Sequence, residues 1–287
     1  MSSNADRQGP TPPGMRTPAG ANDDSMKVMT TWIDETVRVA GIDVHLRTAG
    51  RGEPLLVLHH DIGRPQTDPL PDRLAERFTV LAPTHPGYDG CPRPSWLRSV
   101  RDVAVLYQGL LAERGPASLT LLGLGFGGWI AAEMATMAPG DLRRLIVVGA
   151  MGIKPERGEI LDQALVSYVD YVRAGFVDPG GLERVFGADL PTPLLERWDM
   201  NREMTFRLAW RPYMYNPTLP HLLGVVRTPA LVVWGREDRI VPLECGERYG
   251  KALPGARLLV MERAGHFLDL ERPAELAQAI VDFAAQS

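Results

Sequence analysis

The sequence predicts a mostly parallel β-sheet flanked by helices, with a helical insertion late in the chain. Short apolar runs that end in turn residues alternate with stretches whose apolar residues recur about every 3.6 positions. A glycine-rich turn at 123–128 joins one such run directly to a helix of small apolar residues. Residues 153–226 contain no convincing strand. Because alternating strands and helices are typical of this class, we predict an α/β fold.

Length and composition fit one large domain that binds a small molecule. The chain has 287 residues, 45% of them hydrophobic, which is enough to bury a sizeable core. The net charge of −4 and the scattered Lys and Arg residues argue against a nucleic-acid surface or a polybasic membrane patch. No apolar run approaches the roughly 20 residues that cross a bilayer. We therefore expect a small-molecule ligand, no nucleic acid and no membrane, and we leave a homodimer open.

Cysteine content and the first residues indicate the setting of the protein. Cys91 and Cys245 form neither a disulfide framework nor a metal-ligand spacing, which favours a reducing, cytoplasmic compartment without metal or cofactor. Residues 1–25 are rich in Pro, Gly, Ser and Asn and lack the apolar segment of a signal peptide. Such a composition cannot bury apolar surface, so we expect a disordered tail there.

The elements of the sheet can be predicted in order along the chain. Residues 35–48 hold two β-rich halves around Ala40-Gly41, which indicates an antiparallel hairpin. Later apolar runs are short and bounded by turn residues, as buried parallel strands are. They lie at 54–60, 78–86, 118–125, 142–150, 229–235 and 256–265. Helices are predicted between them and at the end of the chain, at 70–78, 100–115, 127–138 and 273–286.

The block at 153–226 is predicted to form a helical cap over the strand ends. Helical stretches occur at 159–176 and 193–210, and the block carries Trp198, Trp210 and Tyr213. These aromatic side chains either line a ligand pocket or pack the cap onto the core, and the sequence leaves both interpretations open. The expected organisation is a tail at 1–25, a first core part at 26–152, a cap at 153–226 and a second core part at 227–287.

Polar residues that directly follow strands are candidates for a site, because ligands bind at the carboxyl ends of strands in such sheets. Asp238 lies three residues after Gly235, either as a solvated loop residue or as the carboxylate that orients an imidazole. His266 precedes the last helix and is either structural or a general base. His60 and Asp61 follow the first buried strand, where their polarity is equally compatible with an ordinary loop.

The turn at 123–127 has the outline of a nucleophile elbow, G-x-S-x-G, but its tip is Gly125. The N–H of Phe126 at the start of the next helix can still donate to an anionic oxygen. Gly123, Gly125 and Gly128 also match the dinucleotide pattern G-x-G-x-x-G. That interpretation is disfavoured, because two strands and a hairpin precede the turn and no acidic strand end follows about 20 residues later.

From about residue 36 onward the chain resembles the α/β-hydrolase superfamily. The pieces LLVLHH, APTHPGYDGC, GLGFGGWIAAE, WGREDRIVP and AGHFLDLERP occur in the order of that family. The resemblance implies that Asp238 is the acid and His266 the base of a triad. It also implies that the backbone N–H groups of Phe126 and Asp61 form the oxyanion hole.

The departures from the family pattern decide which chemistry to expect. The resemblance places Gly125 at the position of the nucleophilic serine, and His60 where the family usually has glycine. Without a side chain at the tip, no covalent acyl-enzyme can form there. The missing hydroxymethyl group leaves space for a water or substrate atom beside His266.

We therefore expect an enzyme that acts on a small, apolar, carbonyl-containing substrate by general-base catalysis. His266 and Asp238 would form the catalytic dyad of a hydrolase or lyase without a covalent serine intermediate. The expected pocket candidates are His60, Trp198, Trp210 and Tyr213. The alternative is a catalytically inactive protein of the same fold that binds a small ligand.

Overall fold

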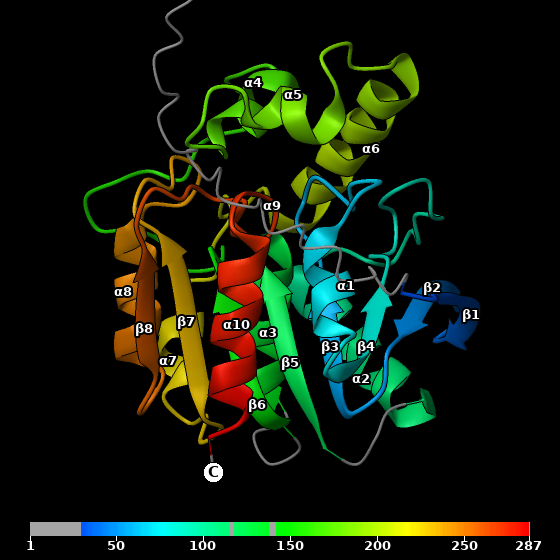
Figure 1. Ribbon diagram of the computed structural model, residues 1–287, viewed down its shortest axis with the longest axis vertical. Coiled ribbons are helices and arrows are strands. Elements are labelled where there is room, and N and C mark those ends of the chain that lie inside the picture. The colour runs from blue at the N-terminus through cyan, green and yellow to red at the C-terminus, as the bar shows by residue number, and fades with distance from the viewer. Residues whose placement is uncertain (1–29, 115–117, 138–141, 287) are drawn as a thin grey trace, which may run out of the picture.

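An eight-stranded sheet forms the centre of the computed structural model, which describes residues 30–114, 118–137 and 142–286 (Figure 1). The expected tail at 1–25 lies outside the described residues. The strand order is β1-β2-β4-β3-β5-β6-β7-β8. Strands β1 and β2 are antiparallel to their neighbours, and every pairing from β4 to β8 is parallel. The predicted mostly parallel α/β sheet, including its N-terminal hairpin, is thus confirmed.

The strands lie close to the predicted runs. Their bounds are β1 Ile33–Val39, β2 Ile42–Ala49, β3 Glu53–Leu58, β4 Phe78–Pro83, β5 Leu119–Leu124, β6 Leu142–Val148, β7 Ala230–Gly235 and β8 Arg257–Met261. The helices are α1 Pro69–Leu74, α2 Val100–Arg114, α3 Phe126–Met137, α4 Tyr168–Ala174, α5 Gly181–Phe186, α6 Thr192–Ala209, α7 Leu219–Leu223, α8 Leu243–Ala252, α9 Leu268–Glu271 and α10 Pro273–Ala284.

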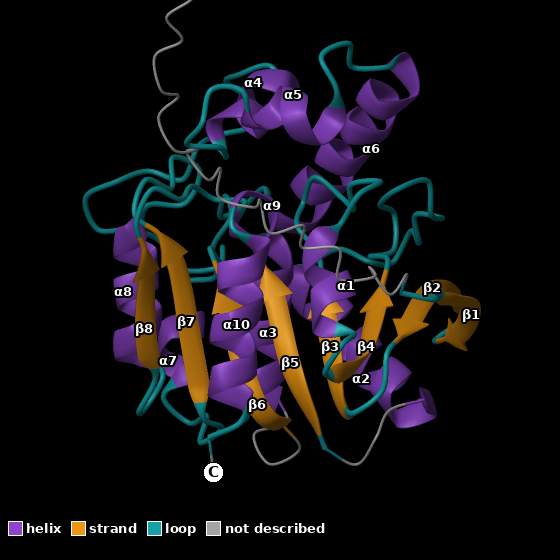
Figure 2. Ribbon diagram, viewed as in Figure 1, coloured by secondary structure: helices purple, strands orange, loops and turns teal. Residues whose placement is uncertain are grey.

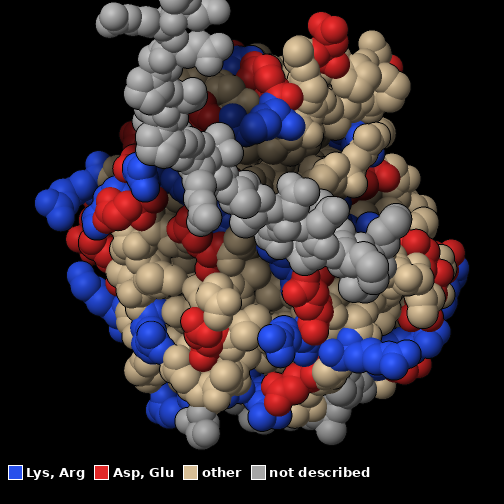
Figure 3. All heavy atoms as spheres, viewed as in Figure 1, with Lys and Arg blue, Asp and Glu red and all other residues tan. Residues whose placement is uncertain are grey.

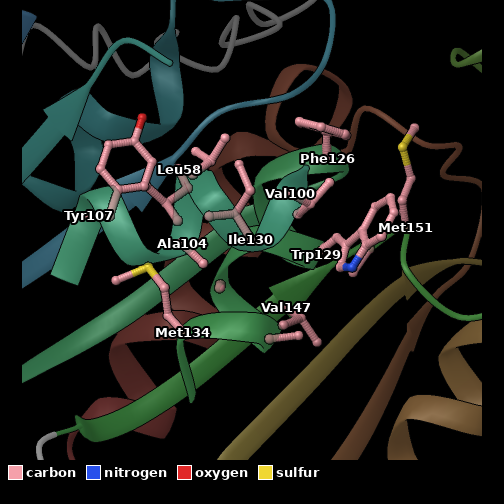
Figure 4. Packing of buried hydrophobic residues seen from close by; sticks show 14 of the residues in the cluster. Leu58, Val100, Ala104, Tyr107, Phe126, Trp129, Ile130, Met134, Val147 and Met151 are labelled. Carbon is pink, nitrogen blue, oxygen red and sulfur yellow. The ribbon is translucent and has the colours of Figure 1, made fainter. Parts of the chain in front are cut away.

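Helices cover both faces of the sheet, which explains why its central strands β5, β6 and β7 are almost completely buried (Figures 1 and 2). Alternate side chains of a strand point to opposite faces, so Val147 joins the cluster under α2, α3, α7 and α8, whereas Val148 joins the cluster under α1, α9 and α10. Helix α3 packs Ile130 and Met134 beside Ala104 of α2 (Figure 4). The small residues of α3 let it lie close to the sheet directly after the glycine turn.

The segment between β6 and β7 divides into two parts. Helices α4, α5 and α6 lie above the carboxyl ends of the strands, whereas α7 packs beside the sheet against α3 and α8 (Figure 1). The helical layer over the strand ends therefore stops before α7, short of the expected boundary at 226.

The helix expected at 159–176 forms only over its second half, as α4. Residues before it form a turn, in which the N–H of Leu165 donates to the Asp162 carbonyl, and they also bond to other parts of the chain. The N–H of Leu161 donates to the Ile240 carbonyl over 2.9 Å, and that of Gln163 donates to the Tyr213 hydroxyl over 2.9 Å. Ser167 then caps the start of α4. Tertiary hydrogen bonds thus override the local helical pattern.

The surface carries both signs of charge. On the face in Figure 3, Lys and Arg side chains alternate with Asp and Glu rather than gathering into one field. Within residues 30–114, 118–137 and 142–286, no helix is long and apolar enough to cross a membrane.

Candidate active site

The loops after the parallel strands bring the candidate residues to one edge of the sheet. His60 follows β3, Gly125 follows β5, Asp238 follows β7 and His266 follows β8. Parallel strands end at a common edge, so residues far apart in sequence converge there. The edge lies directly beneath α4 to α6 (Figure 1).

His266 and Asp238 form a buried, oriented pair. Their side chains are 0% exposed, and Nδ1 of His266 lies 2.9 Å from Oδ2 of Asp238. The other oxygen of Asp238 accepts hydrogen bonds from the N–H groups of Ile240 and Val241, at 2.9 and 2.8 Å, which fix the carboxylate. Because the carboxylate can only accept, the imidazole carries its hydrogen on Nδ1 and presents the lone pair of Nε2.

The charges around His266 oppose the effect of its burial. Burial lowers the pKa of His266, but the charge and the hydrogen bond of Asp238, followed by the charges of Asp61 and Asp269, outweigh it and raise the pKa. Nε2 is buried and has no hydrogen-bond partner among the described residues. The pair therefore presents one free, basic nitrogen to the interior of the site.

The glycine turn is fixed by the backbone of two neighbouring strands. Gly125 has φ +51° and donates its N–H to Val148 over 2.9 Å. A Cβ on Gly127 would collide with the Leu58 carbonyl, so the helix approaches β3 only because this residue is glycine. A Cβ on Gly125 would lie 3.0 Å from Nε2 of His266 and would overlap Nδ1 of His60. The tip of the turn therefore accepts glycine alone without displacing a neighbour.

His60 fills part of the space that the sequence led us to expect beside the tip. Its Nε2 lies 2.9 Å from Oδ1 of Asp269, and the ring is 3% exposed. The His60 ring packs edge-on against Phe267, and its centroid lies 5.3 Å from that of His266. Like Nε2 of His266, Nδ1 of His60 is buried without a partner among the described residues. The expectation of an open space left by the missing side chain is therefore wrong in part.

Asp61 brings a third polar group to the same place. Its Oδ2 accepts a hydrogen bond from the Tyr171 hydroxyl over 2.8 Å and another from the Gln163 amide, whereas Oδ1 is buried without a partner among the described residues. Burial, followed by the charge of Asp61, raises the pKa of Tyr171 well above its usual range, so the phenol stays a donor. A carboxylate oxygen of Asp61 lies within 4.8 Å of a ring nitrogen of His60 and of His266.

The aromatic residues expected in the pocket differ in burial and in their neighbours. Trp198 is 2% exposed and packs edge-on against Tyr168 within the helical layer. Trp210 is 47% exposed and lies at the surface. The Tyr213 hydroxyl accepts from the N–H of Gln163 and so positions the residue that bonds Asp61. The rings of Trp210 and Tyr213 lie edge-on with centroids 6.4 Å apart, whereas Trp198 packs against Tyr168.

Sequence reasoning missed the residues that form hydrogen bonds to the candidate side chains. Asp269, Gln163 and Tyr171 were not among the candidates, although each bonds a residue that was. Asp269 is three positions after His266, but it bonds His60, which is 209 positions away. No local spacing reveals such a partnership.

The site is enclosed, and a hollow lies next to it. His60, Asp61 and His266 are at most 3% exposed. The hollow has a volume of about 290 Å³ and is lined by Phe176, Leu270 and Glu271 among others. The Phe176 ring lies 5.2 Å from that of Phe267, which itself touches both imidazoles. Two aromatic rings thus separate the hollow from the buried nitrogens.

The chain is similar over most of its length to hydrolases. It is 28% identical over 275 residues to 2-hydroxymuconate semialdehyde hydrolase of Pseudomonas sp. strain CF600, covering 89% of this chain and 95% of that protein. It is 27% identical over 263 residues to a 2-hydroxy-6-oxononadienedioate/2-hydroxy-6-oxononatrienedioate hydrolase of Paraburkholderia phymatum, covering 85% and 91%.

Solved structures share the fold. A meta-cleavage product hydrolase from Pseudomonas fluorescens IP01 superposes with a TM-score of 0.74 at 21% identity, covering 87% of this chain and 96% of that one. The family model described as "Alpha/beta hydrolase family" matches residues 56–279, which span β3 to α10 and every residue of the site. With this sheet, this order of strand-end residues and this match, the chain belongs to the alpha/beta hydrolase family.

Proposed function

We propose that the protein is a hydrolase or lyase that acts on a small carbonyl compound without a covalent serine intermediate. His266, oriented by Asp238, is the general base. The observation that carries the proposal is the buried, unpartnered Nε2 of His266, which faces the tip of a turn that has no side chain. We also infer that Gly125 stands at the position where the family carries its nucleophile.

The names of the relatives suggest a class of substrate. Several of them hydrolyse 2-hydroxy-6-oxo unsaturated acids, including the 2-hydroxy-6-oxo-2,4-heptadienoate hydrolase of Pseudomonas putida. A substrate with an oxo group beside a cleavable carbon–carbon or carbon–oxygen bond suits a site with one base and no nucleophilic side chain. We therefore propose an enol-containing oxo acid, or an activated ester, as the substrate.

In the proposed reaction, water takes the place of the missing nucleophile. Nε2 of His266 accepts a proton as the water oxygen bonds to the carbonyl carbon, and the N–H groups of Phe126 and Asp61 stabilise the negative oxygen. The bond between the carbonyl carbon and the leaving group then breaks. The leaving group keeps the electron pair and takes the proton back from His266, so the dyad ends as it began.

A turnover screen tests the proposal. The panel contains simple esters, enol esters and 2-hydroxy-6-oxodienoic acids, with products identified by mass spectrometry. His266→Ala should remove turnover of any substrate found, and Asp238→Asn should cost about 10⁴-fold, because the imidazole then adopts the wrong tautomer. His221→Ala is the matched control, since His221 is exposed on α7.

Two results would count against this function. Full activity in His266→Ala would remove the base from the mechanism, and a fluorophosphonate adduct mapped to a serine would reveal a covalent nucleophile. If no panel member turns over but one raises the melting temperature and shifts tryptophan emission, the binding-only alternative takes its place.

A further inference from the structure

We propose that His60, Asp61 and His266 bind a divalent transition-metal ion of the zinc class beside Gly125. The proposal goes beyond the function above and does not rest on it, because the ion would occupy the lone pair of Nε2 of His266 and so compete with its use as a base. Its basis is the position of one donor atom on each residue. The three donor atoms lie within 4.8 Å of one another, on side chains that are almost completely buried.

Each imidazole forms a hydrogen bond to a carboxylate through the ring nitrogen that would not bind the ion. Nδ1 of His266 bonds Asp238 and Nε2 of His60 bonds Asp269, each over 2.9 Å. Metal-binding histidines commonly donate their other N–H to a carboxylate in this way, which fixes the ring and leaves a lone pair for the ion. Here both rings direct that lone pair toward the same small space.

Asp61 completes the set in the same manner. The Tyr171 hydroxyl and the Gln163 amide donate hydrogen bonds to its Oδ2, while Oδ1 has no partner among the residues that the structure describes. The space is therefore bordered by two nitrogen lone pairs and one carboxylate oxygen, all acceptors. A buried acceptor without a donor costs about 1–3 kcal/mol. One cation relieves all three at once.

The donor set indicates the kind of ion. Two imidazole nitrogens and one carboxylate oxygen form the ligand set of a zinc site that keeps its fourth position open. In a tetrahedral site with metal–ligand distances of about 2.1 Å, two donors lie roughly 3.4 Å apart. The donor atoms here lie within 4.8 Å of one another, so ion binding must draw them together, by up to roughly 1.4 Å for the most distant pair.

Gly125 is a second, independent observation. A Cβ there would overlap Nδ1 of His60 and lie 3.0 Å from Nε2 of His266, the two nitrogens that we assign to the ion. The glycine thus keeps both ligands in place. If its only role were to omit a hydroxyl group, an alanine would be sufficient, but an alanine would displace the His60 ring.

Metal content and metal binding test the inference without any substrate. The full-length protein is stripped with a chelator, dialysed and titrated with Zn²⁺ by calorimetry and with Co²⁺ by visible absorption. We expect one ion per chain, with the intense visible bands of four-coordinate Co²⁺. His60→Ala, His266→Ala and Asp61→Ala should each weaken binding more than 100-fold, whereas His221→Ala should leave it unchanged.

Two further variants separate ion binding from general damage. Asp269→Asn should weaken binding about 10–100-fold, as the loss of an outer partner of a ligand does. Gly125→Ala should weaken it strongly although every ligand is retained. Melting curves identify variants that fail to fold, and for those the conservative Asp61→Asn and His60→Gln replace the alanines. Absence of stoichiometric binding, or equal affinity in the ligand variants, overturns the site and leaves water or a shared proton between the imidazoles.

The inference and the proposed function fail in different ways. With the ion bound, Nε2 of His266 is a ligand and is no longer free as a base, so added Zn²⁺ should inhibit a reaction that uses His266 as its base. If Zn²⁺ binds and activates instead, the metal site stands and the general-base role falls. If turnover depends on His266 but no ion binds, the general base stands and the metal site falls.

Discussion

The protein contains two pairs of buried histidines a few ångströms apart, and they differ in what their ring nitrogens meet. In the first pair, His59 and His85 stack with ring centroids 3.7 Å apart, and every nitrogen is used. His59 bonds the His60 carbonyl through Nδ1 and accepts the N–H of His85 through Nε2. His85 bonds the Tyr107 hydroxyl and the His59 carbonyl. In the second pair, His60 and His266 each leave one buried nitrogen without a partner among residues 30–114, 118–137 and 142–286.

The surroundings explain the difference. Burial, followed by the positive charge of Arg64, lowers the pKa of His59 to about 3, and burial also lowers that of His85 well below its usual value. These rings are neutral structural links. Around His266 the neighbours are carboxylates, which raise its pKa. Burial alone therefore does not indicate the role of a histidine, whereas the hydrogen-bond partners of its two ring nitrogens do.

Removing one histidine from each pair tests most directly whether the two pairs differ in role. His266→Ala should lower turnover of any substrate found by at least about 10⁴-fold, the loss that a wrong tautomer alone causes in a triad. His85→Ala should leave turnover per folded molecule within a few-fold of the wild type. Steady-state kinetics on both variants, corrected for the folded fraction, checks this. Equal losses would mean that the two pairs do not differ in role.

Stability should fall in both variants, for different reasons. His85→Ala removes a buried ring and leaves the Tyr107 hydroxyl and the His59 carbonyl without partners, so we expect a loss of about 2–4 kcal/mol in unfolding free energy. His266→Ala should cost about 3–5 kcal/mol, because it leaves the buried carboxylate of Asp238 without the imidazole that pairs with it. Urea denaturation measures both, and an unchanged stability in His85→Ala would contradict its structural role.

The tip glycine provides a third comparison. Gly125→Ala adds a Cβ at φ +51° that overlaps the His60 ring, and we expect a loss of about 2–4 kcal/mol from backbone strain and overpacking. Gly90→Ala is the matched control, because φ is +83° and no atom lies within 4 Å of its added Cβ. That variant should lose only about 1 kcal/mol. Gly125→Ser should also lower native turnover. Equal losses in the two alanine variants would show that His60 does not confine the tip.

Asp68 tests how an unpartnered buried atom is satisfied when no ligand is involved. Its Oδ1 is enclosed and has no partner within the part of the chain that the structure describes, and burial, followed by the charge of Asp269, raises its pKa to about 7. Asp72 also raises the pKa, whereas Arg64 and Arg47 lower it. The native state thus holds a proton that the unfolded state releases near pH 4, so stability should fall as pH rises from about 4 to 7.

We expect this fall to be about 1–2 kcal/mol, less than the full shift implies, because the residue is half-buried. Asp68→Asn should flatten the stability curve in that window, as measured by chemical denaturation at several pH values. An unchanged slope would show that Asp68 ionises normally and that its enclosed oxygen is satisfied in another way.

The sequence predicted the strands that carry the site better than the contacts inside the site. The strands and their order along the chain follow from apolar runs bounded by turn residues. The ends of these strands bring His60, Gly125, Asp238 and His266 to one edge of the sheet. The failures have tertiary causes. Residues before α4 have a helical pattern but bond to distant loops, and the boundary of the helical layer depends on where α7 packs.

The proposed metal site could not be predicted from the sequence for the same reason. Short spacings such as those of zinc motifs report ligands on one element, whereas His60 and His266 lie on loops that are 206 positions apart. Asp61 adds a carboxylate beside His60, but an Asp after a strand is common in loops. Only the fold shows that the free atoms of these three residues face each other.

One contact between α4 and the last strand loop has a consequence for how the site operates in time. The Gly175 carbonyl at the end of α4 accepts the N–H of His266 over 2.8 Å and that of Phe267 over 3.2 Å. A substrate reaches the enclosed nitrogens only after some part of the covering layer moves. If that part is the end of α4, both bonds break and the backbone that carries His266 is released. Entry of the substrate and displacement of His266 would then occur together, and the reaction could proceed only after α4 returned to its place. The slow step of turnover would be this closure, on the microsecond-to-millisecond scale of segment motions, rather than proton transfer.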